Sequence, residues 1–216
     1  MSDEAALLAA ILAPPDEDTP RLMFADWLEE NGQPERAEFI RIQCAPDADE
    51  AAEERAAELE NRNRSKWLAG LPQFPGARWE FRRGFPEYLD VSGKLMLERY
   101  DAFVRVPWLR CLSLHALRGR GLAGDFANRP WNSRWVELEF DADTSSRDVV
   151  VLVNCPQVSQ LRRIELVMNV ITPDVIAALA KSPHLEHIRR LHLYGDRDDP
   201  RFALLRERFG DRLAIG

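Results

Sequence analysis

The stretch of this chain that most resembles a chemical site is the glycine-rich segment Gly119–Gly124, which has the spacing G-x-G-x-x-G. In dinucleotide-binding proteins such glycines precede a helix whose N–H groups bind the pyrophosphate, and a later carboxylate binds the ribose. Asp141 stands at the right distance to be that carboxylate. However, only Asp125–Arg129 separates the last glycine from Pro130, which leaves room for little more than one helical turn. The sequence therefore favours a flexible loop, and we predict no bound cofactor.

Histidine and cysteine could supply metal ligands or a nucleophile, and their spacing argues against both. His184 and His187 could lie near each other, but no suitable third ligand is adjacent in the sequence. Cys44, Cys111 and Cys155 form no C-x-x-C pair, which is typical of a reduced, cytosolic compartment. Cys111 and Cys155 are expected to be buried, where a thiol acts as a small apolar side chain. The motifs of serine hydrolases, P-loop proteins, zinc proteases and EF-hands are absent from the sequence. We therefore predict no metal site, no catalytic residue and no enzymatic activity.

The strongest pattern is a motif that recurs four times between Leu109 and Asp196. Each copy begins with a large apolar residue and has further apolar residues three and five positions later; the copies begin at Leu109, Trp135, Leu161 and Ile188. By subtraction, the starts are 26, 26 and 27 residues apart. Self-similarity at this period is typical of stacked repeats, and the inner L-x-x-L-x-L resembles that of leucine-rich repeats.

The repeats predict an α/β fold, with an N-terminal helical bundle or cap followed by a short leucine-rich-repeat-like solenoid. Each repeat would contribute a strand, a loop, a helix and a proline turn, giving a parallel sheet with outer helices. Asp148–Val153 is expected to be helical although its valines favour strands. The other expected elements are a degraded first strand at Phe85, Tyr88 and Val91, helices at Lys94–Arg105, Ile176–Ala180 and Phe202–Leu205, and an edge strand with Leu213 and Ile215.

Alternation along the strands predicts which side chains point away from the helices. They would form a concave face of twelve positions, two of which are Cys111 and Val167. Tyr and Arg are enriched at binding hot spots, so the C-terminal end of this face is the stronger candidate. A charged, solvated face without a partner is the alternative interpretation. The ten positions predicted to bind a partner are Ser113, His115, Glu137, Glu139, Asp141, Arg163, Glu165, Arg190, His192 and Tyr194.

The N-terminal part predicts four helices with short connections. Ser2 is expected to cap the first helix, and Thr19 to cap the second. Pro34 would begin the third helix. The fourth, from about Asp47 to Trp67, is rich in residues with high helix propensity.

Charge divides the chain in the same way. Residues 1–65 contain 17 Asp and Glu against 6 Lys and Arg, a net charge of −11, whereas the remainder has 19 against 23, a net of +4. Such asymmetry suggests two modules with different surfaces. We assign residues 1–70 to an acidic helical head and residues 77–216 to the solenoid, with a proline-rich turn between them.

The head also carries a family resemblance. Residues 18–43, DTPRLMFADWLEENGQPERAEFIRIQ, resemble the repeat-companion domain of planctomycete-type bacterial proteins, which commonly precedes leucine-rich repeats. The resemblance implies architecture rather than chemistry, because the family brings no established catalytic residue. FADWLEE would be either a partner-binding segment or a core segment with solvated acidic residues. The motif residues are Asp18, Pro20, Arg21, Phe24, Ala25, Asp26, Trp27, Leu28, Glu29, Gly32, Arg36, Ala37, Phe39, Ile40 and Gln43.

These features predict a cytoplasmic, non-catalytic protein–protein interaction module: an adaptor, sensor or regulatory subunit. Its partner would be another protein, encoded nearby, that carries the activity. We expect no membrane insertion, because no apolar run approaches the ~20 residues needed to cross a bilayer. The acidic N-terminal segment does not resemble a secretory signal.

Two alternatives remain open at the level of the sequence. The first is a nucleotide-binding enzyme that uses Gly119–Gly124. The second is a nucleic-acid-associated subunit, although the acidic head lacks the basic residues that phosphate contacts need. The arginines available to the second alternative are Arg118, Arg120, Arg162, Arg163, Arg189 and Arg190.

Overall fold

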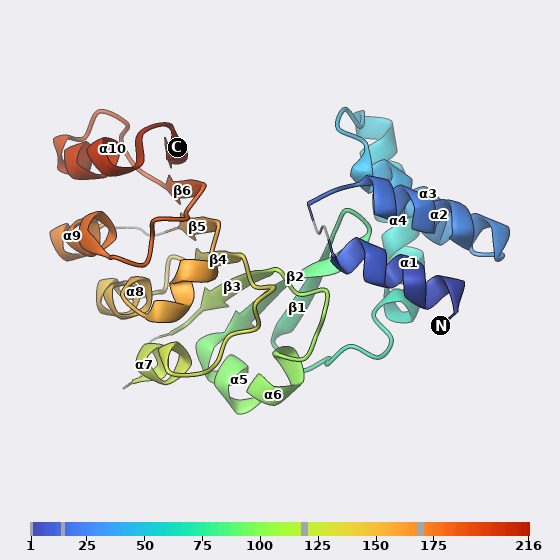
Figure 1. The fold of residues 1–216 in the computed structure, drawn as a ribbon, viewed down its shortest axis with the longest axis horizontal. Coiled ribbons are helices and arrows are strands. Elements are labelled where there is room, and N and C mark those ends of the chain that lie inside the picture. The colour runs from blue at the N-terminus through green and yellow to red at the C-terminus, as the bar shows by residue number, and fades with distance from the viewer. Residues whose placement is uncertain (1, 14–15, 118–120, 168–170) are drawn as a thin grey trace. The chain divides into compact units, whose positions relative to one another are not determined.

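The computed structural model describes residues 2–13, 16–117, 121–167 and 171–216. Within them the chain is a mixed α/β protein with ten α-helices and one seven-stranded sheet (Figure 1). Its internal contacts divide it into two compact units. The first contains Met1–Leu71 and Glu80–Glu87, and the second contains Pro72–Trp79 and Tyr88–Gly216.

The first unit contains the four predicted helices. Ser2 caps the first helix, as predicted, because its side chain accepts a hydrogen bond from the N–H of Ala5. Two predicted starts were wrong: Thr19 is already helical and follows Asp18 at the N-cap, and the fourth helix begins after a cap by Asp49. The helices are α1 (Asp3–Leu12), α2 (Thr19–Glu30), α3 (Pro34–Cys44) and α4 (Glu50–Trp67).

Two strands, β1 (Ala77–Arg82) and β2 (Phe85–Ser92), follow the helices. The two-residue link Arg83-Gly84 joins them. Both link residues have positive φ, 48° for Arg83 and 81° for Gly84. The tip of this hairpin belongs to the first unit.

The sheet of the second unit adds one strand after another in chain order, and every pair from β2 to β7 is parallel. The apolar positions of the repeated motif align across the sheet, so that Leu112 pairs with Leu138 and Leu138 with Ile164. These motif side chains are at most 2% exposed and form the core. The strands are β3 (Cys111–His115), β4 (Glu137–Phe140), β5 (Arg163–Leu166), β6 (Arg190–Leu193) and β7 (Leu213–Ile215).

Helices connect the strands and lie in a row on one side of the sheet (Figure 1). Asp148–Val153 is helical, as predicted, within a helix that begins at Ser146. Ser145 caps this helix, and Val149, Leu152 and Val153 are buried. Burial thus outweighs the strand preference of valine. The helices are α5 (Gly93–Glu98), α6 (Tyr100–Phe103), α7 (Leu122–Ala127), α8 (Ser146–Val153), α9 (Pro173–Lys181) and α10 (Ala203–Phe209), with 3₁₀ turns at Pro156–Gln160, Pro200–Phe202 and Gly210–Arg212.

Three predictions for this unit were wrong in detail. In β2 the core positions are Leu89 and Val91, whereas Tyr88 pairs with Cys111 on the opposite face. The single helix predicted for Lys94–Arg105 is divided in two at Arg99, whose backbone is not helical. Leu204 is 53% exposed, because the buried side of α10 consists of Leu205 and Phe209.

Candidate partner-binding face

Eight of the ten predicted partner-binding residues lie at alternate positions of β3–β6, on the sheet face opposite α7–α10, and Asp141 and Tyr194 each follow a strand by one residue. The register places them in two rows that cross the strands. We call this surface the polar face. The first row is Tyr88, Cys111, Glu137, Arg163 and Arg190, and the second is Asp90, Ser113, Glu139, Glu165 and His192.

The β2–β3 end of the polar face is buried. Ser113 is only 3% exposed, and its hydroxyl donates to Glu139 Oε1 at 3.4 Å. Tyr88 is 7% exposed and donates to the other oxygen of the same carboxylate at 3.3 Å. Ser113 therefore positions Glu139 and does not offer the exposed contact that alternation predicts.

The next residue of interest, His115, is half-buried beside Asp90. Its Nδ1 lies 2.9 Å from Asp90 Oδ1, and Arg78 Nη2 donates to the other oxygen at 3.3 Å. Sequence reasoning missed Asp90, because it took Tyr88 rather than Leu89 as a core residue of β2. The register Leu89↔Leu112 corrects this, and it places Asp90 beside Ser113 in the second row.

At the other end, four side chains from β5, β6 and the residue after β6 form what we call the Glu165 cluster: Arg163, Glu165, His192 and Tyr194. Glu165 accepts from Arg163 Nη2 at 2.6 Å and from the Tyr194 hydroxyl at 2.9 Å, and His192 Nδ1 lies 3.4 Å away. The His192 and Tyr194 rings lie 4.6 Å apart. These contacts hold two half-exposed groups, the guanidinium and the phenol, in fixed positions on the surface.

The electrostatics of the cluster follow from these contacts. Partial burial alone would raise the pKa of Glu165, but the hydrogen bonds from Arg163 and Tyr194 outweigh it, and the net pKa is lowered. The pKa of Tyr194 is raised, because its hydroxyl donates to the carboxylate. At neutral pH the cluster is therefore an ionised carboxylate with a protonated phenol and a guanidinium around it.

The other predicted partner-binding residues differ from one another in exposure and in position. Glu137 is half-buried in the first row, and Arg190 is exposed beside Arg163. Asp141 lies one residue past β4, where its carboxylate accepts from the Asp143 N–H and the Thr144 hydroxyl. Asp141 therefore organises the turn before α8, which alternation along a strand does not predict.

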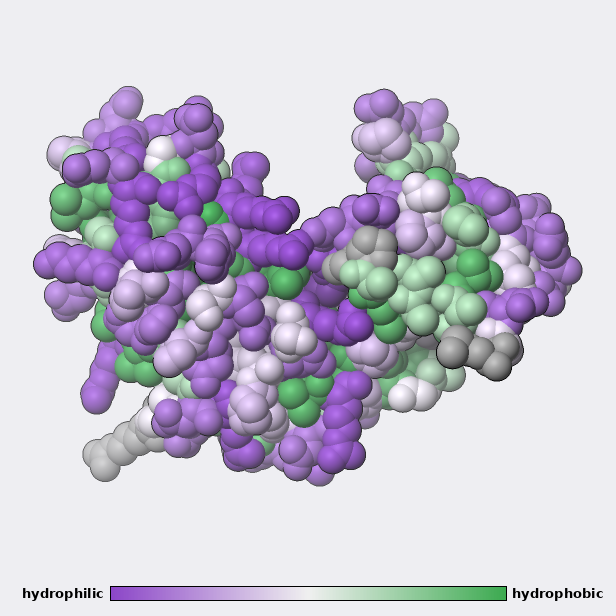
Figure 2. Space-filling model, viewed as in Figure 1, coloured by the Kyte–Doolittle hydropathy of each residue, from purple (hydrophilic) through white to green (hydrophobic). Residues whose placement is uncertain are grey.

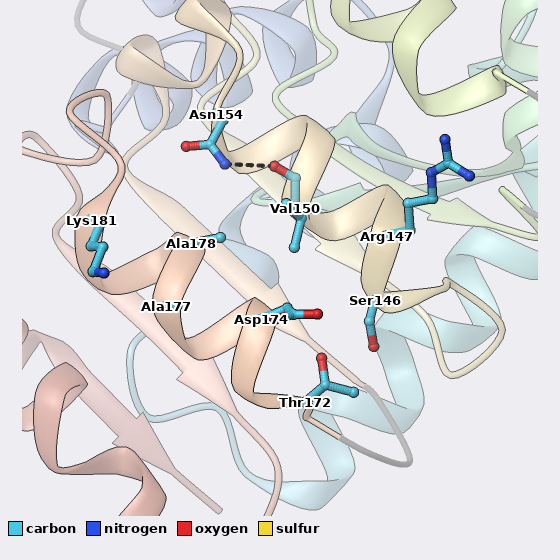
Figure 3. Close-up of a pocket in the computed structure, with 9 residues that line it drawn as sticks. All are labelled: Ser146, Arg147, Val150, Asn154, Thr172, Asp174, Ala177, Ala178 and Lys181. Atoms are coloured by element: carbon cyan, nitrogen blue, oxygen red, sulfur yellow. Dashed lines mark hydrogen bonds between the residues drawn. The ribbon is translucent and has the colours of Figure 1, made fainter.

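A cleft of about 800 Å³ lies on the other side of the sheet, between α8 and α9 (Figure 3). Ser146, Thr172 and Asp174 lie at one end, and Asn154 and Lys181 at the other. Asn154 donates to the carbonyl of Val150 at 2.8 Å and so caps α8. The cleft has mixed charge and small side chains, and nothing in its arrangement favours one ligand chemistry.

The structure also shows where the glycine-rich segment, the paired histidines and the cysteines lie. Gly121 has φ 87° before α7, which is six residues long, while Arg118, Gly119 and Arg120 lie outside the described residues. His184 is half-buried and His187 exposed. Cys111 and Cys155 are buried, as predicted. In the described ranges, no three His, Cys, Asp or Glu side chains are grouped closely enough to hold a metal ion.

The segment that resembles the repeat-companion domain, residues 18–43, belongs to the first unit. Arg21 donates to the carbonyl of Arg83 at 3.2 Å and pairs with Glu87, while Arg36 donates to the carbonyl of Gly84. The N–H of Gly84 in turn donates to Gln43 Oε1 at 2.7 Å. We call these contacts the hairpin clamp.

Aromatic rings surround the clamp. Arg36 lies over Trp67 and Phe81, with its Cζ 4.5 and 5.1 Å from the ring centroids. Phe24 packs on Phe85, and Leu28 is buried. In FADWLEE, Phe24, Ala25 and Leu28 are core residues, as the second interpretation expects, whereas Trp27 is only half-buried. The acidic side chains are exposed.

A patch of apolar residues lies over α1 and α2 of the first unit (Figure 2). Met23 is 56% exposed and Leu22 39% exposed, and the alanines of α1 add to the patch. Among the helices that the structure describes, none is long and apolar enough to cross a membrane.

Comparison with known proteins found no matching family model, no matching curated protein and no matching solved structure.

Proposed function

We propose that this chain is a non-catalytic protein–protein interaction module that binds a partner protein through the polar face of its sheet. The observation that carries the proposal is the Glu165 cluster. A guanidinium and a phenol, the side chains most enriched at hot spots, are already held in one geometry by a shared carboxylate. Such preorganisation reduces the entropy lost on binding.

The proposal includes the architecture. The first unit would be a repeat-companion head, and the second a short leucine-rich-repeat-like solenoid. Support for the head comes from the family motif, whose Arg21, Arg36 and Gln43 all contact the hairpin tip. Support for the solenoid comes from the 26-residue period and from strands that pair in parallel in chain order.

The role would be that of an adaptor, sensor or regulatory subunit, with the activity carried by the partner. We propose a cytoplasmic location on the ground that all three cysteines are free thiols. The proposal includes no cofactor. Glu137, Arg163 and Arg190 lie side by side across the strands, and they form a regular, charged surface that needs none.

Photo-crosslinking in cells that express the protein naturally tests this proposal. Tyr194 on the polar face, 42% exposed, is replaced with photoreactive p-benzoylphenylalanine, and Leu204 on α10, 53% exposed, is replaced likewise as the matched control. We expect one discrete crosslinked protein from position 194 and none from position 204. Equal labelling from both positions, or no crosslink from position 194 in folded protein, would contradict the proposal.

A further inference from the structure

A cavity of about 550 Å³ is lined in part by β7, the last strand of the sheet. This strand ends beside the C-terminal label in Figure 1. All three residues of this strand, Leu213–Ile215, line the cavity. Four guanidinium groups and one carboxylate, that of Asp211, line the rest, which gives the lining a net charge of +3. The four arginines are Arg190, Arg197, Arg206 and Arg212.

Backbone carbonyls accept hydrogen bonds from three of these four guanidinium groups. Arg197 Nε donates to the carbonyl of Ile215 at 2.8 Å, and Arg206 Nη2 to that of Asp199 at 3.1 Å. Arg212 Nη1 donates to the carbonyl of Ile188 at 3.0 Å. Within the part of the chain that the structure describes, none of the four lining arginines has an ion-pair partner. Arg206 interacts electrostatically with the Asp199 carboxylate, and the charges of Arg190, Arg197 and Arg212 are available to an anionic group.

The outer edge of β7 has a specific hydrogen-bonding pattern. Gly216 bonds to β6 and its extension, donating to Leu193 and accepting from Gly195. Backbone groups of a parallel strand alternate between its two neighbours, so those of Leu213 and Ile215 point away from β6, toward the cavity. The Leu213 N–H is used by the carbonyl of Gly210, and the Ile215 carbonyl is used by Arg197.

Two edge groups are left, the Leu213 carbonyl and the Ile215 N–H. Among the described residues neither has a hydrogen-bond partner. In a parallel pair, each bonded residue of one strand donates its N–H to the carbonyl of one residue on the other strand and accepts from the N–H two residues further on. On β7 these two groups are the Leu213 carbonyl and the Ile215 N–H. An antiparallel neighbour would need both groups of a single residue, and each of these two residues has one group occupied. The edge therefore suits a parallel strand.

We propose that this edge binds an extended, acidic segment of a partner polypeptide, which adds to the sheet as a parallel eighth strand. One residue of the segment donates to the Leu213 carbonyl and accepts from the Ile215 N–H, and neighbouring carboxylates pair with the lining guanidinium groups. A nucleic acid would satisfy the arginines but not the backbone pair, which is why a peptide is favoured. The proposal does not depend on the function proposed for the polar face.

Fluorescence anisotropy with a labelled decapeptide of alternating Glu and Thr tests the proposal on the whole chain. We expect saturable binding that weakens as salt is added, and no binding of the matched Lys–Thr peptide. A Glu–Thr peptide with N-methylated backbone keeps every carboxylate but loses the N–H donors. It should bind about tenfold more weakly, the loss expected for one or two hydrogen bonds.

Variants of the chain locate the site. Arg197→Glu should weaken binding of the Glu–Thr peptide by about tenfold or more. Arg197→Lys should weaken it by less, because lysine keeps the positive charge. Ile215→Pro removes the edge N–H and should weaken binding, whereas Ile215→Val keeps it. Equal binding of the N-methylated peptide, equal binding of a single-stranded RNA decamer, or no binding of the Glu–Thr peptide overturns the proposal.

Discussion

Gly84, at the tip of the β1–β2 hairpin, is the position where a single added methyl group should do the most measurable damage. Its φ is 81°, a conformation that residues with a Cβ rarely adopt. A Cβ built there would lie 2.4 Å from Ile40 Cγ1 and 3.0 Å from the Ile40 Cα. The second atom is backbone, so the contact cannot be relieved by a side-chain rotation alone. Gly84→Ala should therefore displace the tip from the hairpin clamp.

The expected cost has two parts. Left-handed backbone costs a non-glycine residue about 1–2 kcal/mol, and overpacking at a tight contact costs about 1–3 kcal/mol. The sum, about 2–5 kcal/mol, is a large part of the 5–15 kcal/mol that is typical of a folded domain. Gly32 supplies the matched control: its φ is 77°, but nothing lies within 4 Å of a Cβ built there. Gly32→Ala should therefore cost only the backbone contribution, about 1–2 kcal/mol.

Urea unfolding followed by circular dichroism, with hydrogen exchange of peptides from α2 and α3, measures both variants. Gly84→Ala should be less stable than Gly32→Ala by about 1–3 kcal/mol. Combining Gly84→Ala with Ile40→Ala should cost less than the sum of the two single changes, because the Cγ1 contact is gone. Two glycine variants of equal stability, or additive effects with Ile40→Ala, would refute the reasoning.

Two further predictions concern titratable groups. Burial raises the pKa of the Cys44 thiol to about 11. At pH 8 this thiol should therefore react with iodoacetamide on the order of a hundredfold more slowly than a free cysteine, as measured by peptide mass spectrometry. Alkylation of Cys44 in the folded chain at the rate of a free cysteine would contradict this prediction. The pKa of Glu165 is lowered from its ordinary value of 4.5, so the ionised carboxylate stabilises the fold above that pH, and the stability is lost as the pH falls through the lower folded-state value. The difference in urea midpoint between the wild type and Glu165→Gln should therefore be largest near pH 7 and shrink below pH 4.5; a constant difference would be inconsistent with the contacts of Glu165.

The parts of the fold that were predictable from sequence are those set by local patterns. The L-x-x-L-x-L spacing placed β3–β6 and their buried side chains, because alternation along a strand needs no knowledge of distant residues. It failed in β2, where apolar residues occupy both faces and the phase is ambiguous: Tyr88 and Leu89 are both buried. Pairing with β3 decides the phase, and pairing is a long-range property.

The parts of the candidate site that could not be predicted depend on contacts between distant positions. Glu165 and Tyr194 are 29 residues apart, and their hydrogen bond follows from the β5–β6 register rather than from any motif. Arg21 and Arg36 belong to the segment that resembles the repeat-companion domain, but their acceptors lie 62 and 48 residues away. The edge groups of Leu213 and Ile215 became visible only when the neighbours of β7 were known.

The central claim, that the polar face binds a partner protein, is tested most directly by a dissociation constant. The protein crosslinked from position 194 is purified and titrated by calorimetry with three forms of the chain. They are the wild type, Arg163→Ala with Tyr194→Ala, and the control Arg147→Ala with Lys181→Ala in the cleft on the other side of the sheet. Loss of a hot spot worth about 2 kcal/mol should raise Kd about 30-fold for the first pair, while the control should leave it unchanged. An unchanged Kd for Arg163→Ala with Tyr194→Ala, with the fold intact, would contradict the account.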